Sequence, residues 1–228
     1  MSISTAIPAP FKASRATPEL PLNPPLSEIL PGEPGDGAAA LGFALGWAQR
    51  LSQGLVVWCI PGQSLAEEGA PYAPGLAQYG LSLDKLLIVR TRTQAEALWA
   101  GEQALKIPAA LSLITIAPAR KPLSLTATRR LLLLAEKHRT HCILLRFDAA
   151  TASAAWARWR VRASPSAGVN RELGAPAFAA ELLRNRAGPA GFSAQLVWNA
   201  HEHCFAALDG DLAAAAGDRS AEARRQSA

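Results

Sequence analysis

Hydrophobic and polar positions along the chain form two alternating kinds of pattern. Short apolar runs rich in Val, Ile and Leu are typical of buried strands, whereas apolar residues three or four positions apart are typical of helices. The predicted strands cover residues 55–61, 85–90, 110–117 and 141–147. The predicted helices cover residues 38–52, 72–81, 93–106 and 125–139. Because the predicted strands and helices alternate along the chain, the pattern predicts a mostly parallel central sheet flanked by helices.

The pattern changes after Phe147. Three further runs have the composition of strands, at residues 155–164, 178–186 and 195–208, and Arg-, Gly- and Pro-rich segments join them. The Gly-Pro-Ala-Gly sequence at residues 188–191 is typical of a hairpin turn. We therefore predict an α/β fold in which C-terminal antiparallel strands extend the mostly parallel sheet.

Length and composition suggest the domain boundaries and the compartment. The chain has 228 residues, half of them hydrophobic, which suffices for one domain with its own core. We predict a flexible Pro-rich arm over residues 1–25, one domain over residues 26–208, and a flexible or helical Ala/Arg-rich tail over residues 209–228. Three widely spaced cysteines favour a reducing compartment, and no apolar run is long enough to span a membrane. We expect a soluble cytoplasmic protein without membrane contact.

Positive charge is concentrated in one segment of the chain. The 23 basic and 18 acidic residues give a net charge of +5, and four of these five charges arise between residues 146 and 186. Arg158, Arg160 and Arg162 alternate along a predicted strand, so their side chains share one face with Trp156. Such a face suits phosphate groups or an acidic protein surface, and a solvated outer face is the alternative.

The segment GEPGDGAA matches part of a phosphate-binding loop. The pattern G-x-x-x-x-G-K-[ST] is met by Gly32 and Gly37, with Gly35 between them. The next two positions should hold a lysine for the phosphates and a hydroxyl residue for magnesium, but the chain has Ala38 and Ala39 there. The segment is therefore either a degenerate phosphate loop or a glycine-rich turn that never bound nucleotide.

Acidic residues in this loop also oppose nucleotide binding. Glu33 and Asp36 would place negative charge beside a phosphate, although the backbone amides at the start of the next helix attract anions. We expect no hydrolysis, at most weak nucleotide binding, and no cofactor. His201, His203 and Cys204 suggest a metal site, but no second Cys/His pair with zinc-site spacing accompanies them, so none is predicted.

Several segments in a fixed order resemble a known family. They are PLSEILPGEPGDG, YGLSLDKLLIVRTRTQAEALWAGEQAL, SLTATRRLLLLAE, WARWRVRASPS and AELLRNRAGPAGFSAQLVWN. Together they resemble the ImuA family, RecA-like accessory proteins of bacterial damage-induced mutagenesis, over the chain from Leu26 to Leu208. The resemblance implies a RecA-like core. As partners it implies an ImuB-like inactive Y-family polymerase, an error-prone DNA polymerase, and RecA or DNA.

The resemblance also implies positions for chemistry. The catalytic glutamate of RecA-type ATPases would follow the strand VVWCI, where Gln63 is the nearest polar residue, and the magnesium-associated aspartate would fall at Ala117. Arg184 and Arg186 match a basic run that lies at the RecA subunit interface. Arg146 ends the strand that leads into a DNA-binding loop in that family.

These observations support one hypothesis and two alternatives. The hypothesis is a non-catalytic RecA-like adaptor in translesion DNA synthesis that scaffolds the two polymerases. The alternatives are a RecA-type nucleotide-dependent ATPase or DNA-binding regulator, and a SulA-like inhibitor of cell division. The candidate surface for a partner or DNA consists of Arg146, Trp156, Arg158, Arg160, Arg162, Arg184 and Arg186.

Overall fold

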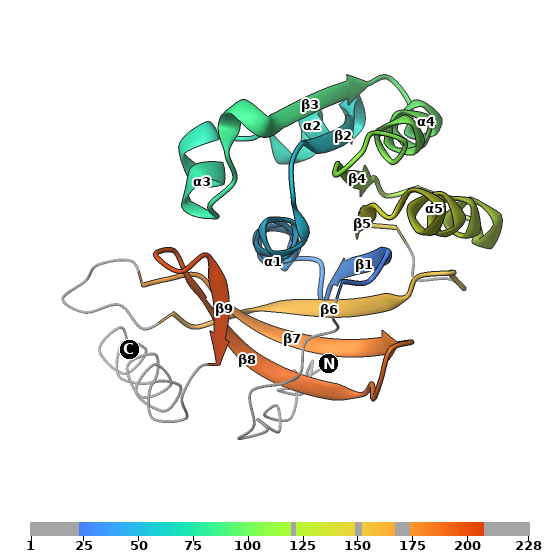
Figure 1. Cartoon of the computed structure of the whole chain (residues 1–228). Helices are drawn as coiled ribbons and strands as arrows, with labels where there is room; N and C mark the ends of the chain where they lie inside the picture. The colour runs from blue at the N-terminus through green and yellow to red at the C-terminus, as the bar shows by residue number, and fades with distance from the viewer. Residues whose placement is uncertain (1–22, 120–121, 149–151, 167–173, 208–228) are drawn as a thin grey trace, which may run out of the picture.

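The computed structural model describes residues 23–119, 122–148, 152–166 and 174–207. The tail predicted over residues 209–228 lies outside the described residues, and so does the arm predicted over residues 1–25 apart from its last three positions. The described residues form one sheet of nine strands with helices on its faces (Figure 1).

The strand order along the sheet is β3-β2-β4-β5-β1-β6-β7-β8-β9. The parallel part consists of β1 (Leu26–Pro31), β2 (Val56–Pro61), β3 (Leu86–Thr91), β4 (Leu111–Ile116) and β5 (His141–Arg146). The other strands are β6 (Ala157–Ser164), β7 (Ala177–Asn185), β8 (Phe192–Asn199) and β9 (Cys204–Ala207). β6 runs parallel to β1 and antiparallel to β7, and β8 and β9 continue the antiparallel pairing. The predicted mostly parallel sheet with C-terminal antiparallel strands is confirmed.

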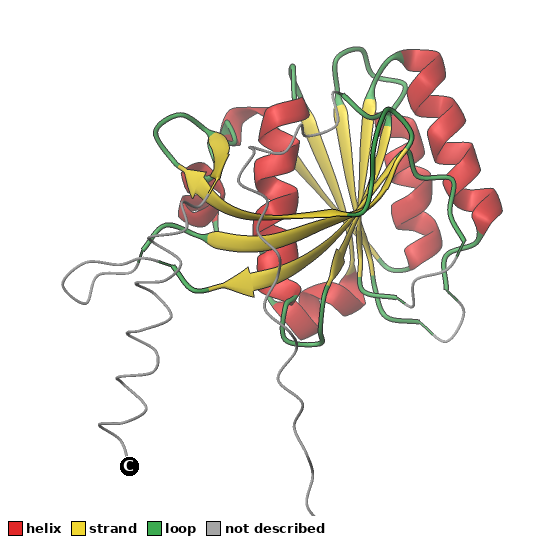
Figure 2. Ribbon diagram, turned by 90° about the horizontal axis from the view of Figure 1, so that it is seen from below, coloured by secondary structure: helices red, strands yellow, loops and turns green. Residues whose placement is uncertain are grey.

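Helices cover both faces of the parallel part, as the view along the sheet in Figure 2 shows. They are α1 (Gly37–Leu51), α2 (Gly62–Glu68), α3 (Ala73–Gln78), α4 (Gln94–Ala104) and α5 (Leu125–His138), with the 3₁₀ turn η1 (Leu83–Lys85). The core on one face is built around α1, and the core on the other face around α4 and α5. Side-chain caps fix two helix starts: the Thr93 hydroxyl accepts from the N–H of Glu96, and the Ser124 hydroxyl from that of Ala127.

The core on the α1 face is rich in aromatic rings. Phe43 and Trp47 of α1 stack with 6.0 Å between ring centroids, and both contact Trp159 of β6. Gly46 lets the helix approach the late strands closely, because a Cβ there would lie 2.6 Å from a ring atom of Phe205 and 2.8 Å from one of Trp198. α1 therefore joins the parallel and antiparallel parts of the sheet into one core.

Four features differ from the sequence prediction. The hydrophobic pattern does not reveal β1, because Glu28 interrupts its apolar run, or α2, a seven-residue helix that follows Pro61 directly. The run at residues 195–208, predicted as one strand, is divided, since β8 ends at Asn199 and β9 begins at Cys204. β6, expected to be antiparallel, also pairs in parallel with β1.

Candidate functional site

The glycine-rich loop lies between β1 and α1, at the edge where the parallel strands end and where open α/β sheets bind their ligands. The carboxylate of Asp36 accepts hydrogen bonds from the backbone N–H groups of Glu33 and Ala163, both at 2.9 Å. The N–H of Gly32 donates to the carbonyl of Val161 at 2.7 Å. These bonds attach the loop to β6. The carboxylate of Asp36 also occupies two backbone N–H donors next to the place where a phosphate would bind.

The first turn of α1 offers methyl groups in place of a phosphate-binding side chain. Gly37, Ala38 and Ala39 begin the helix, and Ala38 is exposed. A Cβ added to Gly35 would meet nothing within 4 Å, so packing does not require glycine there. At Gly32 a Cβ would lie 2.3 Å from Cγ of Arg162, which packs against the loop. Packing against β6 thus explains Gly32 without a bound nucleotide.

The ends of β2 and β4 carry neutral groups as well. After β2 the chain enters α2 at once, and exposed Gln63 donates to Glu67 at 3.1 Å. At the end of β4 the side-chain amide of Gln94 accepts from the N–H of Ala117 at 2.9 Å and donates to the carbonyl of Thr115 at 3.2 Å. The resemblance assigned a magnesium-associated aspartate to Ala117. The side-chain amide of Gln94 from α4 therefore occupies the backbone groups at this position. Sequence reasoning did not foresee Gln94, because nothing local links it to β4.

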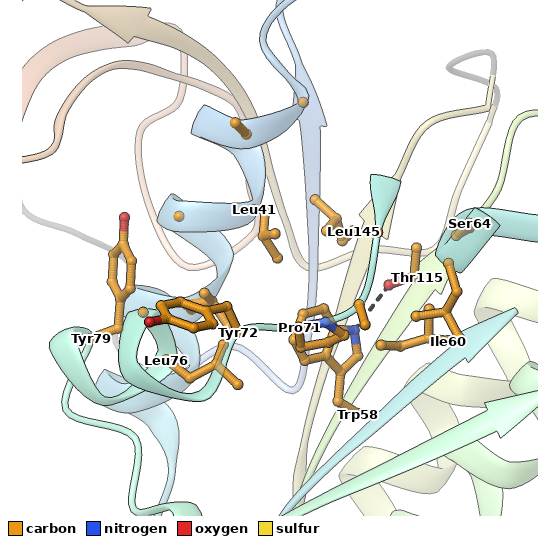
Figure 3. A pocket seen from close by; sticks show the side chains of 18 of the residues that line it. Leu41, Trp58, Ile60, Ser64, Pro71, Tyr72, Leu76, Tyr79, Thr115 and Leu145 are labelled. Carbon is orange, nitrogen blue, oxygen red and sulfur yellow. Dashed lines mark hydrogen bonds between the residues drawn. The ribbon is translucent and has the colours of Figure 1, made fainter. Parts of the chain in front are cut away.

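A cavity of about 430 Å³ lies beside the first turns of α1, on the α1 face of the sheet (Figure 3). Its walls come from α1, the ends of β2, β4 and β5, and the segment containing α2 and α3. They include the apolar side chains of Leu41, Trp58, Ile60, Pro71, Leu76 and Leu145. No described residue that lines it carries a charged side chain. We name this feature the apolar cavity.

Six described lining residues carry polar side-chain groups: Trp58, Ser64, Tyr72, Gln78, Tyr79 and Thr115. The indole N–H of Trp58 donates to the hydroxyl of Thr115 at 3.0 Å, so these two groups satisfy each other. Burial raises the pKa of Tyr79 to about 12, which keeps its hydroxyl neutral. Ser64 of α2 is only 4% exposed, and its hydroxyl has no hydrogen-bond partner among the described residues. An unsatisfied buried hydroxyl costs free energy, but the Ser64 oxygen is covered by its surroundings, so an occupant of the cavity could reach it only if the side chain moved.

On the opposite face of the sheet, a buried network joins four charged side chains. Glu28 of β1 accepts from Nη1 of Arg146 at 2.9 Å and from Nε of Arg158 at 2.7 Å. The carboxylate of Asp148 accepts two bonds from Arg146, both at 2.7 Å, and one from the N–H of Leu123. Two guanidinium groups thus face two carboxylates, which leaves the network neutral.

The assignment of Arg146 to an exposed partner surface is wrong. Its side chain is fully buried, as is that of Glu28. Burial alone would lower the pKa of Arg146, but the hydrogen bonds with Asp148 and the charge of Glu28 raise it overall. Arg146 therefore holds β1 and β5 together. A glutamate inside an apolar strand, such as Glu28 in LSEILP, was the signal for a buried ion pair.

The other arginines of the candidate surface do share one face, but acids accompany each of those on β6. Along β6, Trp159 and Val161 are buried on the α1 side, and the arginines between them point to the other side. The ion pairs are Arg158–Glu28 at 2.7 Å, Arg160–Glu181 at 3.1 Å and Arg162–Glu33 at 3.9 Å. Trp156 is half-buried against the core on the α5 side. These pairs reduce the positive charge that the sequence suggested for this face.

A groove with an excess of positive charge remains between α5 and the β6–β7 pair. We name it the basic groove, and its lining residues are Leu125, Arg129, Leu132, Leu133, Glu136, Ala152, Ser153, Ala154, Arg158, Arg184 and Arg186. Arg184 donates from Nη1 to the carbonyl of Ser153 at 2.6 Å. Burial, and then the charges of Arg186 and Arg158, lower the pKa of Arg184. An anion in the groove would relieve this crowding. Arg129 was missed because it lies on α5, outside the arginine-rich segment.

The described residues contain no cluster of three or more His, Cys, Asp or Glu side chains that could hold a metal ion. His201 and His203 lie in the turn between β8 and β9 rather than on a strand. Among the helices of the described part of the chain, none is long and apolar enough to cross a membrane.

No protein-family model matches the chain. The crystal structure of SulA from Pseudomonas aeruginosa is similar at a TM-score of 0.40 and 18% identity. The match covers 55% of this chain and 98% of that one. A TM-score and an identity this low do not establish a common function. Protein ImuA from two strains of Caulobacter vibrioides, NA1000 / CB15N and ATCC 19089 / CB 15, is 32% identical over 205 residues. The match covers 80% of this chain and 80% of each relative, and the chain therefore belongs to the ImuA family.

Proposed function

We propose that the protein is a non-catalytic cytoplasmic adaptor in damage-induced translesion DNA synthesis. Its partners would be an ImuB-like inactive Y-family polymerase and an error-prone DNA polymerase. Membership of the ImuA family supports an accessory role in damage-induced mutagenesis. We also propose that the fold is RecA-like.

The observation that carries the non-catalytic part is the chemistry at the carboxyl edge of the parallel strands. Catalysis of phosphoryl transfer depends on cations that neutralise the phosphates and on groups that hold magnesium. At this edge the chain places Ala38 and Ala39 on α1 and the carboxylate of Asp36 in the loop, and the Gln94 amide closes the end of β4. The residues present do not fit a magnesium–triphosphate complex.

The basic groove is the surface that we assign to a partner. Four arginines line the groove, and Glu136 is the one acidic residue among its described lining residues. Glu28 lies beneath Arg158. Leu125 and Leu133 of α5 are 50% and 55% exposed beside them. Positive charge next to exposed apolar side chains favours an acidic protein segment with apolar anchors over a nucleic-acid backbone, which would use only the charge. Arg160 and Arg162 lie on the same face of β6, beyond the groove.

Charge reversal in the groove tests this assignment. The double variant Arg129→Glu/Arg186→Glu should weaken binding of the purified ImuB-like partner or polymerase at least tenfold, since like charges across an interface cost several kcal/mol. Arg90→Glu/Arg92→Glu makes the same charge change at two exposed positions at the end of β3 and serves as the control. Equal affinities for the two double variants would refute the groove. A single-stranded oligonucleotide bound more tightly than either protein would reassign it to DNA.

A further inference from the structure

The two walls of the basic groove differ in chemistry. The helix wall, formed by α5, carries three leucines, one arginine and one glutamate, so it has no net charge: Leu125, Arg129, Leu132, Leu133 and Glu136. The strand wall, formed by β6 and the end of β7, carries three arginines: Arg158, Arg184 and Arg186. The net positive charge of the groove therefore lies on the strand wall, and its exposed apolar side chains lie on the helix wall.

A short segment between the two walls holds them apart. The N–H of Ala154 donates to the hydroxyl of Thr128 on α5 at 3.0 Å. The carbonyl of the preceding residue, Ser153, accepts from Nη1 of Arg184 on β7 at 2.6 Å. Ser153 and Ala154 are both buried. The helix wall cannot close onto the strand wall while these bonds persist, so an occupant has to match both walls as they stand.

Two arginines of the strand wall lie directly opposite each other. Arg158 of β6 and Arg184 of β7 are cross-strand partners, and like charges at such positions destabilise a sheet. The register shifts between Arg158 and Trp159, and β-bulges, which shift the register in this way, are frequent beside active sites. Glu28 neutralises Arg158. Among the described residues, no acidic side chain forms an ion pair with Arg184 or Arg186. Carboxylates of a partner would supply the missing negative charge.

The contrast between the walls matches an extended segment, whose successive side chains point in opposite directions. A segment that lies along the groove directs every second side chain to the strand wall and the side chains between them to the helix wall. We propose that the basic groove binds an extended segment of a partner protein in which acidic and apolar residues alternate. The carboxylates pair with Arg184 and Arg186, and the apolar side chains pack on Leu125 and Leu133. This inference deepens the adaptor function proposed above and rests on it.

The length of the helix wall favours an extended segment over a helix. Leu125 and Leu133 are eight positions apart on α5, which corresponds to about 12 Å at about 1.5 Å per residue. An extended chain covers this length with about four residues, two for each wall. A helix over the same length would have about two turns, which is too short to be stable by itself in water. Binding it would therefore cost more ordering free energy than binding the extended segment.

Two peptides of equal composition test the alternation. Acetyl-Asp-Leu-Asp-Leu-Asp-Leu-amide alternates acidic and apolar residues, and acetyl-Asp-Asp-Asp-Leu-Leu-Leu-amide carries the same charge and the same apolar area in two blocks. In NMR titrations of the full chain, the alternating peptide should shift the methyl signals of Leu125 and Leu133 with a Kd of about 0.1 to 1 mM. The block peptide should bind at least fivefold more weakly, because it cannot serve both walls along its length. Equal affinities, or no saturable shift with the alternating peptide, would overturn the proposal.

The conformation of the bound peptide is a second readout. Transferred nuclear Overhauser effects should be strong between each Hα and the amide hydrogen of the next residue, as in an extended chain. Strong effects between successive amide hydrogens, which are typical of a helix, would overturn the extended mode of binding even if the affinities followed the prediction.

Two substitutions at exposed positions test one wall each. Arg186→Gln should weaken the alternating peptide at least fivefold, because a charge-assisted hydrogen bond is lost. Leu133→Ala should weaken it about threefold, because apolar contact is lost. The matched controls are Arg90→Gln and Leu87→Ala, both exposed on β3 and outside the groove, and they should leave the affinity unchanged. An affinity in either groove variant equal to that of its control would overturn the assignment of that wall.

Competition with the purified partners distinguishes failure of this inference from failure of the adaptor function. The alternating peptide should displace the ImuB-like protein or the polymerase from the wild type, and the block peptide should need at least fivefold higher concentration. Partner binding that is lost in Arg129→Glu/Arg186→Glu but resists the alternating peptide would overturn the inference and leave the adaptor function standing. Absence of binding to both partners would overturn the adaptor function, and the polymerase origin of the segment with it. A single-stranded oligonucleotide that binds more tightly than the alternating peptide, and that Arg186→Gln weakens, would reassign the groove to nucleic acid.

Discussion

The substitution Glu28→Gln removes one charge from the buried network and keeps the shape of the side chain. In the wild type Glu28 is fully buried and accepts from Arg146 at 2.9 Å and from Arg158 at 2.7 Å. With glutamine at position 28, two guanidinium groups remain and Asp148 is the single carboxylate of the network. The side-chain NH₂ of glutamine is a hydrogen-bond donor and would face a guanidinium N–H, which is also a donor. The network would therefore hold an uncompensated buried positive charge.

The structure sets the size of the effect. Removing one partner of a buried ion pair costs about 3–5 kcal/mol. Arg146 keeps both bonds to Asp148, and the Arg158 side chain is 17% exposed, so its guanidinium can turn into the basic groove. We therefore expect the lower end, a loss of about 3 kcal/mol in the free energy of unfolding, out of a total that is typically about 5–15 kcal/mol.

Urea unfolding followed by circular dichroism measures this loss. The control is Glu181→Gln, whose partner Arg160 lies 3.1 Å away in a pair that is partly exposed on both sides, and where a loss below about 1 kcal/mol is expected. Adding Arg158→Gln to Glu28→Gln removes the uncompensated charge and should recover part of the stability. A loss below about 1 kcal/mol for Glu28→Gln, or no recovery in the double variant, would show that the network is not a buried, charge-balanced unit.

The remaining predictions concern core packing and alkaline pH. Gly46→Ala should lower the free energy of unfolding by about 1–2 kcal/mol, because the Cβ would lie 2.8 Å from Trp198 and the overpacking exceeds the gain in helix propensity of about 1 kcal/mol; a rise in melting temperature would contradict it. Burial raises the pKa of Cys59 from 9.0 and that of Tyr79 from 10.0, both to about 12, and raises the pKa of Cys142 as well. The unfolded chain therefore loses these protons first, so stability should be fully present below pH 9 and fall as pH rises from 9 towards 12. A urea midpoint that stays constant over that range would contradict it.

Much of the fold was predictable because its strands and helices carry local signals. The buried strands β2, β4 and β5 are short runs rich in Val, Ile and Leu, and α5 begins at a serine cap that the sequence displays. β1 was not predicted, because a glutamate such as Glu28 is usually a surface residue. Its buried partner Arg146 lies 118 positions away in the sequence. The apolar residues around Glu28 indicate a buried ion pair, but a local pattern does not identify Arg146 as the partner.

The candidate site was predictable only where the chemistry is local. The alanines that replace a lysine and a hydroxyl residue are visible in the sequence, and so is the acidic residue Asp36. The two amides that bind its carboxylate are not, because one belongs to Ala163 on β6. The apolar cavity was invisible for the same reason, since its walls come from α1, three strand ends and two short helices. Arg146 was assigned to the surface because it ends the strand that leads into a DNA-binding loop in the family that the chain resembles.

Isothermal titration of the purified chain with MgATP tests the central claim most directly. The account predicts no heat beyond dilution at nucleotide concentrations up to about 1 mM, and no phosphate release over the same time. The reason is that Ala38, Ala39 and the carboxylate of Asp36 stand where the charge of a triphosphate would have to be met. Saturable one-site binding in the micromolar range would contradict it.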